Sequence, residues 1–292
     1  MKMNRIFLYI SIAFLIFFIY ILLVGIMRTD KIADKTYDFE NETSLKNRGI
    51  CLIKKAINPA SCQEIKSFCE KKEYKKAKHA LIESPRLKRF IHEKAGPNYI
   101  FQDYIWIIQK SSVHTCHRDN NGDFFNENQK HPSYTMLIYL EDMEKCLGVV
   151  PESHLVEGSF GVNVTDPVVN VLCNKGDAIL FNANLIHVGA INELDDNLRI
   201  QMKVTHKDDI EALKYYQNFN KIVNSDNNIP KNILRVQKNI SCMFPFISDL
   251  SQGENIKTAR GSSDGAEIGF FQRMFSLIFY GNSSFYDLPD AL

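Results

Sequence analysis

An unbroken apolar run near the start of the chain constrains how the rest can fold. From Ile6 to Met27 the sequence contains no charged residue, and Arg5 and Arg28 stand directly on either side. A run of this length can cross a bilayer as one helix. A cleaved signal peptide has a shorter apolar region and small residues at its cleavage site, and the residues around Gly25 do not fit that pattern. We therefore expect an uncleaved single-pass anchor.

The side of the membrane on which the rest of the chain lies is less constrained. Basic residues flank the run at both ends, so the positive-inside rule does not choose an orientation. Four N-x-S/T sequons favour a luminal domain. They begin at Asn41, Asn163, Asn239 and Asn282.

Composition and patterning indicate one globular domain behind the anchor. The expected units are a flank at 1–5, the anchor at 6–27, a polar stem at 28–47, a domain at 48–250 with a β-rich core at 97–206, and a flexible linker with an apolar C-terminal segment at 251–292. Within the last unit, the apolar stretch 268–280 is too short to span a bilayer. It is expected to dock on the domain, with a position at the membrane interface as the alternative. Residues 208–222 carry apolar side chains at helical spacing and predict an amphipathic helix.

Charge and cysteine usage exclude some classes of protein. The formal net charge of +1 does not indicate a nucleic-acid-binding surface, and we expect no nucleic-acid partner. The seven cysteines include no C-x-x-C pair, so they fit neither a zinc ribbon nor a disulfide framework.

The tripeptide His117-Arg118-Asp119 follows an apolar, aromatic run at 104–108 that predicts a buried strand. Residues i and i+2 of a strand point to the same side, so His117 and Asp119 can bind one ion while Arg118 points away. An H-x-D tripeptide alone is common by chance. Here the tripeptide indicates a metal site only if a third ligand comes from elsewhere in the chain.

A second segment supplies that ligand. The turn at Gly176-Asp177 leads into a predicted buried strand at 178–181, and His187 follows it. Two imidazoles and one carboxylate are the ligand set of non-haem Fe(II) oxygenases. Arg199 lies in the next apolar strand, at 198–204, where its guanidinium can bind a carboxylate through two hydrogen bonds. A zinc hydrolase is disfavoured because no further His or Cys stands at zinc-ligand spacing.

Several segments between about residues 48 and 206 together resemble one family. They are the strand and helix at 49–53 and 57–65, the strand at 133–142, Leu-Gly-Val-Val-Pro-Glu-Ser-His at 147–154, and Gly-Asp-Ala-Ile-Leu-Phe through Leu-Ile-His at 176–187. This combination is similar to the phytanoyl-CoA dioxygenase-like branch of the Fe(II)/2-oxoglutarate dioxygenases. Two positions depart from the family pattern: Glu152 replaces a usual Gly, and Gln201 replaces a usual Ser or Thr.

The resemblance implies a fold, cofactors and residue roles. It implies a mainly β domain with flanking helices, built on a double-stranded β-helix of the jelly-roll or cupin type. It also implies Fe(II) on His117, Asp119 and His187, with 2-oxoglutarate and O2 as co-substrates and ascorbate as a reductant. Arg199 would hold the distal carboxylate of 2-oxoglutarate. Separately from the resemblance, Thr135 and Tyr139 lie on one face of their predicted strand. They are expected either to contact the same molecule or to serve ordinary strand packing.

The prime substrate stays open at this point. The family resemblance implies hydroxylation of a C–H bond, and an adjacent anchor favours a lipid or a secretory-pathway protein as readily as a small metabolite. A prolyl-hydroxylase-like protein hydroxylase uses the same ligand order and is the first alternative. The second is a non-catalytic β-helix module that binds at a membrane.

Overall fold

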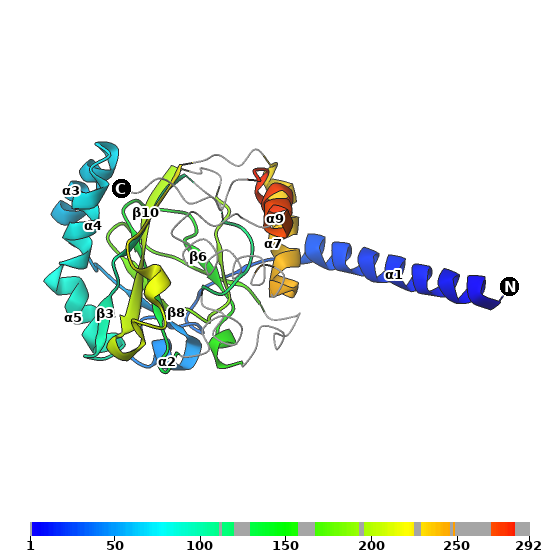
Figure 1. Ribbon diagram of the computed structural model, residues 1–292, viewed down its shortest axis with the longest axis horizontal. Coiled ribbons are helices and arrows are strands. Elements are labelled where there is room, and N and C mark those ends of the chain that lie inside the picture. The colour runs from blue at the N-terminus through cyan, green and yellow to red at the C-terminus, as the bar shows by residue number, and fades with distance from the viewer. Residues whose placement is uncertain are drawn as a thin grey trace.

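A computed structural model describes residues 2–110, 113–119, 129–156, 167–192, 196–224, 229–245, 248 and 270–283. A long helix, α1 (Lys2–Met27), projects from one side of a rounded domain (Figure 1). Its apolar part, Ile6–Met27, is long enough to cross a membrane, and only 6% of it is buried against the rest of the protein. The expected linker residues at 251–269 and the sequon at Asn163 lie outside the described residues.

A seven-stranded sheet forms the larger half of the β core. Its path runs β11-β4-β10-β5-β8-β2, with β3 paired to β10. The strands are β2 (Ile50–Ile53), β3 (Tyr99–Phe101), β4 (Tyr104–Lys110), β5 (Tyr134–Tyr139), β8 (Ala178–Asn182), β10 (Asp196–His206) and β11 (Phe219–Asn224). All pairs are antiparallel except β11 with β4. The long β10 is central because β3, β4 and β5 all pair with it.

The outer face of this sheet is covered by three helices, α3 (Pro59–Glu70), α4 (Tyr74–Ile82) and α5 (Pro85–Lys94) (Figure 1). Every second residue of β5 and β10, such as Met136 and Met202, points into the apolar core beneath these helices. Helix α3 begins where the sequence predicts, since the Asn58 side chain accepts a hydrogen bond from the Ser61 amide and a proline occupies the first turn.

A four-stranded sheet, in the order β1-β7-β6-β9, faces the inner side of the larger sheet. Its strands are β1 (Lys31–Ile32), β6 (Leu147–Val149), β7 (Val169–Val171) and β9 (His187–Gly189). Buried side chains of both sheets share one apolar cluster, in which Val149 and Val169 from the smaller sheet meet Ile179 and Phe181 from the larger. The expected mixed β core with flanking helices is therefore confirmed.

The segment expected to be a polar stem lies along the domain. Strand β1 pairs in parallel with β7, and the Phe39 carbonyl accepts a hydrogen bond from the Leu52 amide. Phe39 itself is buried in the cluster between the two sheets. A short helix, α2 (Ser44–Arg48), then leads into β2.

The amphipathic helix predicted at 208–222 is wrong. Two single 3-10 turns, at Lys207–Asp209 and Lys214–Tyr216, precede strand β11. Between them and the strand, Asn218 adopts a left-handed backbone conformation (φ 56°) that a helix cannot contain. The open edge of β4 accepts residues 219–224 in parallel pairing, so tertiary hydrogen bonding overrides the local apolar spacing.

Two further helices lie on the side of the domain from which α1 leaves (Figure 1). Helix α7 (Lys231–Met243) holds the end of α1, because the Asn239 side-chain amide donates to the carbonyls of Gly25 (2.7 Å) and Arg28 (2.9 Å). Helix α9 (Phe270–Tyr280) docks on the domain through buried Phe275 and Tyr280, which confirms the expected docking. Its other face leaves large apolar side chains exposed, namely Phe270, Met274, Leu277 and Ile278.

Candidate active site

The three expected metal ligands come together at one end of the space between the sheets. His187 begins β9, and the segment that carries His117 runs antiparallel beside it through one bridge, in which each residue's amide donates to the other's carbonyl at 3.0 Å. Gly189 allows this approach, because a Cβ there would clash with the Val113 carbonyl. The sequence predicted a strand at 113–119, whereas only this isolated bridge forms.

The ligand atoms are close enough to share one ion. The candidate donor atoms of His117, Asp119 and His187 all lie within 4.8 Å of one another. One carboxylate oxygen of Asp119, Oδ1, lies 3.6 Å from Nε2 of His117 and 3.4 Å from Nε2 of His187. All three side chains are at least nine-tenths buried. Arg118 points away from them, as expected, and donates to the Asn184 carbonyl at 3.0 Å.

The backbone orients both imidazole rings. Nδ1 of His117 lies 2.8 Å from the Thr115 carbonyl, and Nδ1 of His187 lies 2.9 Å from the Leu185 carbonyl. A carbonyl accepts only, so in each neutral ring Nδ1 carries the proton and the lone pair of Nε2 faces the centre of the triad. This arrangement is typical of metal-binding histidines, whose second nitrogen is held by an outer hydrogen bond. The donor set and its orientation fit Fe(II).

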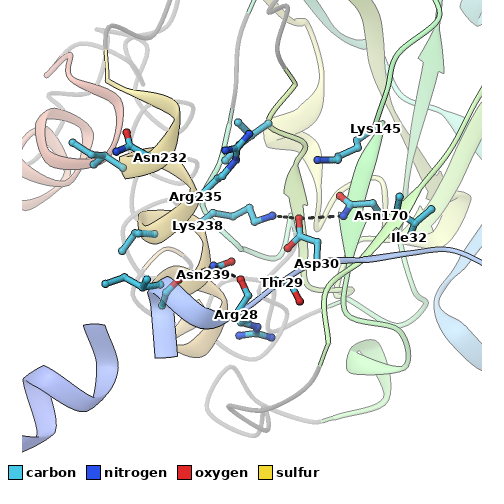
Figure 2. Close-up of a pocket in the computed structure, with 15 residues that line it drawn as sticks. Arg28, Thr29, Asp30, Ile32, Lys145, Asn170, Asn232, Arg235, Lys238 and Asn239 are labelled. Carbon is cyan, nitrogen blue, oxygen red and sulfur yellow. Dashed lines mark hydrogen bonds and ion pairs between the residues drawn. The ribbon is translucent and has the colours of Figure 1, made fainter. Parts of the chain in front are cut away.

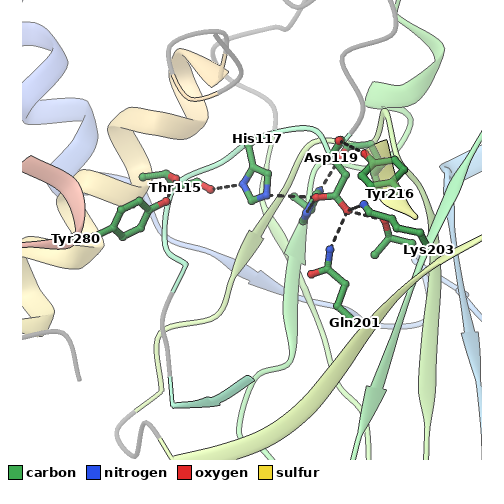
Figure 3. A network of polar contacts seen from close by, with 10 residues as sticks. Thr115, His117, Asp119, Gln201, Lys203, Tyr216 and Tyr280 are labelled. Atoms are coloured by element: carbon green, nitrogen blue, oxygen red, sulfur yellow. Dashed lines mark hydrogen bonds and ion pairs between the residues drawn. The ribbon is translucent and has the colours of Figure 1, made fainter. Parts of the chain in front are cut away.

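The second oxygen of Asp119 is held by the large sheet (Figure 3). Oδ2 accepts hydrogen bonds from the Thr135 hydroxyl at 2.5 Å, the Lys203 ammonium at 2.6 Å and the Gln201 amide at 3.4 Å. Lys203 also donates to the Thr135 hydroxyl at 2.8 Å. These contacts hold the carboxylate so that Oδ1 faces the two histidines.

The electrostatics of the pocket favour an ionised Asp119 between neutral imidazoles. Burial raises the pKa of Asp119, but the Lys203 cation opposes this effect, and the pKa stays well below its usual range. Burial, together with the neighbouring His117 ring, lowers the pKa of His187. A deprotonated carboxylate and neutral imidazoles are the forms that bind a metal.

Lys203 was not among the residues singled out from the sequence. Its position in β10 could have indicated that it lies near the site. Arg199, Gln201 and Lys203 are each two residues apart in this strand and therefore share one face. All three are buried on that inner face, while Ile200 and Met202 point to the helices. A polar side chain at every second position of an otherwise apolar strand was the available signal.

Arg199 and Tyr139 occupy the same inner face, farther along the sheet. They are directly opposite each other in the pairing of β10 with β5, and both side chains are buried. The Arg199 guanidinium donates to the side chain and the carbonyl of Asn197. The Tyr139 hydroxyl is buried and makes no hydrogen bond within the described part of the protein. A ligand oxygen placed here would satisfy this hydroxyl beside the buried Arg199 guanidinium, so the residues fit a carboxylate such as that of 2-oxoglutarate.

Glu152, at a position where the family usually has glycine, keeps a backbone conformation that favours glycine. This residue adopts φ 70°, in the left-handed region where glycine is favoured. Its carboxylate forms an ion pair with Arg48 at 3.3 Å across the loop. The loop therefore keeps the conformation that a glycine permits, and the exposed glutamate side chain is directed toward α2.

One disulfide ties the site to α7. Cys116, next to the ligand His117, bonds to Cys242 across 126 positions of sequence, and the other five cysteines are buried thiols. Sequence spacing did not predict this bond. The Cys116 amide is also held at 2.9 Å by the hydroxyl of Ser241, so α7 supports the segment that carries His117.

Loss of this disulfide is expected to lower the stability of the protein by about 2–4 kcal/mol, because it closes a long loop. In thermal unfolding, reductant should lower the Tm of the wild-type chain to that of the Cys116→Ala/Cys242→Ala double variant. The double variant serves as the control, since its Tm should not respond to reductant. An unchanged wild-type Tm under reductant would mean that the bond contributes nothing to stability.

Comparisons with known proteins show what part of the domain resembles. Residues 78–196 match the family model described as phytanoyl-CoA dioxygenase. A comparison with curated proteins finds no match. Among solved structures, the epimerase SnoN in complex with Fe3+, alpha ketoglutarate and nogalamycin RO is 15% identical with a TM-score of 0.47, over 59% of this chain and 85% of that one. EvdO2 from Micromonospora carbonacea var. aurantiaca is 11% identical with a TM-score of 0.44, over 62% and 94% of the two chains.

The family match spans His117, Asp119 and His187, the three residues that the fold brings together. It therefore agrees with the ligand geometry described above. Residues 78–196 are thus similar to the phytanoyl-CoA dioxygenase family, and the three buried residues that they bring together form a candidate Fe(II) site.

Proposed function

We propose that this protein is a membrane-anchored hydroxylase whose Fe(II) is held by His117, Asp119 and His187. The observation that carries the assignment is the convergence of these three buried donors within 4.8 Å, with both Nε2 atoms turned toward Oδ1 of Asp119. When bound, iron would let O2 oxidise 2-oxoglutarate to succinate and CO2, with the second oxygen atom of O2 going to the C–H bond of the substrate. The protein positions the reactants and excludes water.

Arg199 holds the distal carboxylate of 2-oxoglutarate in this proposal, and Tyr139 contributes a hydrogen bond. Their burial, their direct pairing across the sheet and the unpartnered Tyr139 hydroxyl support the assignment. Gln201, which reaches the Asp119 carboxylate, lies two residues from Arg199, or about 6–7 Å along the strand.

Thr135 and Lys203 act on Asp119 in this proposal. Both hold Oδ2, and their hydrogen bond to each other leaves little freedom for the carboxylate to rotate. The Thr135 hydroxyl, first expected to contact 2-oxoglutarate, is thereby committed to the metal ligand. Outer-sphere partners of this kind commonly change metal affinity 10- to 100-fold.

A luminal position of the domain is supported by the disulfide. Bonds such as Cys116–Cys242 persist in oxidising compartments and are rare in the cytosol. Of the described sequons, Asn41 and Asn282 are exposed, whereas the Asn239 amide is buried in its contact with the end of α1. Glycan attachment is therefore proposed at the first two sites and not at Asn239.

The substrate class that best suits an anchored enzyme is a lipid, a small metabolite or a protein side chain that the enzyme meets at the membrane. Helix α1 holds the domain directly, because its last turn is bonded to α7 without an intervening linker. The reach of the active site is thus limited to the region beside the bilayer.

Succinate formation tests the activity. The full chain in detergent, supplied with Fe(II), 2-oxoglutarate and ascorbate under air, is expected to form succinate slowly in the absence of its prime substrate. The His117→Ala variant is the matched control and should form none. If the wild-type chain formed no succinate and also failed to bind Fe(II) and 2-oxoglutarate, the hydroxylase proposal would be wrong, and a non-catalytic binding module would replace it.

A further inference from the structure

We propose that the cavity between the end of α1 and α7 binds the phosphate group of an anionic lipid headgroup. The cavity has a volume of about 800 Å³, and none of the residues that line it belongs to the metal triad. Figure 2 shows the residues around it. Its walls come from the last turn of α1, the segment that follows it and one side of α7. Binding of a phosphate group in this cavity does not depend on the function proposed above. The assignment of that group to a membrane lipid does depend on α1 spanning the membrane.

The charge of the cavity calls for an anion. Four basic side chains and one carboxylate line it, which leaves an excess of three positive charges (4 − 1 = 3). They are Arg28, Lys145, Arg235, Lys238 and Asp30. The carboxylate is already used, since Asp30 forms an ion pair with Lys238 and accepts a hydrogen bond from the Asn170 amide at 3.1 Å. Charge-assisted hydrogen bonds from Lys and Arg are the usual means of binding phosphate.

The two lysines that line the cavity are held in place by neighbouring residues. Lys238 is 4% exposed, and burial lowers its pKa, opposed by Asp30 and reinforced by the neighbouring Lys145 and Arg28 cations. The backbone of Lys145 is clamped by Asn192, which accepts from its amide at 2.9 Å and donates to its carbonyl at 3.0 Å. Within the described residues, the Lys145 ammonium has no ion-pair partner. Figure 2 shows this side chain directed into the cavity.

The apolar part of the lining indicates a lipid source. Ile26, Ile233 and Val236 line the cavity beside the basic groups. Ile26 and Met27, at the end of the apolar span, are 64% and 76% exposed. The end of a membrane-spanning helix lies at the level of the lipid phosphates, with acyl chains along the helix. A basic cavity at this level, beside exposed apolar side chains, matches a phospholipid in both its charged and its apolar part.

The test is the thermal unfolding of the full chain in neutral detergent, titrated with three probes. Dioleoyl phosphatidylglycerol is expected to raise the Tm by several degrees, because it binds only the folded protein, whereas dioleoyl phosphatidylcholine should leave it unchanged. The Lys145→Gln and Arg235→Gln variants should need at least about tenfold more phosphatidylglycerol for the same shift. Lys75→Gln, an exposed lysine on α4 at the far side of the domain, is the matched control and should respond as the wild type does.

The third probe, sodium phosphate, distinguishes the two sources. A shift with phosphatidylglycerol alone supports a lipid headgroup, and an equal shift with phosphate, lost in the same variants, supports a site for free phosphate. Equal shifts with both lipids, or an undiminished shift in Lys145→Gln and Arg235→Gln, would overturn the proposal. The His117→Ala variant should keep the full lipid response, so failure of the iron site and failure of this site give different results.

Discussion

Replacement of His187 by alanine is expected to abolish Fe(II) binding and succinate formation while leaving the fold in place. In our proposal His187 supplies one of three protein ligands, and its Nε2 faces the same carboxylate oxygen as that of His117. Two remaining ligands do not form the facial set that Fe(II) requires. We expect the affinity for Fe(II) to fall by more than about 100-fold, since loss of a mere outer-sphere partner already costs 10- to 100-fold.

The measurement is Fe(II) binding by equilibrium titration under anaerobic conditions, combined with the succinate assay. His79→Ala removes an exposed imidazole on α4 and is the matched control. The buried ring packs against Phe181 and His117, with ring centroids 4.6 Å and 4.4 Å apart, so His187→Ala should also lose some stability. Thermal unfolding measures that loss and shows whether the variant is folded under the conditions of the iron titration. Normal iron binding by a folded His187→Ala variant would remove His187 from the triad.

The parts of this site that the sequence predicts are those set by local periodicity. Strand β8 is an almost continuous apolar run, and the alternation of apolar and polar residues within β10 places Arg199 on the inner face. The side chains of His117 and Asp119, at positions i and i+2, lie close together even though their segment forms no regular strand. The i, i+2 argument succeeded there because the single bridge to His187 holds the backbone extended.

The parts that the sequence does not predict depend on pairing between distant segments. Nothing local to Lys203 shows that it meets Asp119, because this contact depends on where an irregular loop crosses the sheet. The Cys116–Cys242 bond likewise depends on α7 lying beside the active site. Strand β11 resembled a helix in its apolar spacing, and only the open edge of β4 explains why it is extended.

Replacement of Arg199 by alanine is expected to raise the KM for 2-oxoglutarate about 10- to 100-fold with Fe(II) affinity unchanged. A charge-assisted hydrogen bond contributes about 1.5–3 kcal/mol, which corresponds to this range. The buried Tyr139 hydroxyl remains and still binds one carboxylate oxygen in our proposal, so some affinity should persist. Because Arg199 is no metal ligand, iron titration separates this variant from His187→Ala.

Two conservative variants distinguish recognition of the carboxylate from a merely structural role of the arginine. Arg199→Lys keeps the charge but loses the planar pair of donors, so its KM should lie between those of the wild type and Arg199→Ala. Tyr139→Phe removes only the hydroxyl and should raise the KM less than Arg199→Ala does. An unchanged KM in all three folded variants would place the 2-oxoglutarate site elsewhere. A graded increase would show that the inner face of β10 and β5 binds the co-substrate, because removal of a structural arginine would lower stability without ordering the three KM values in this way.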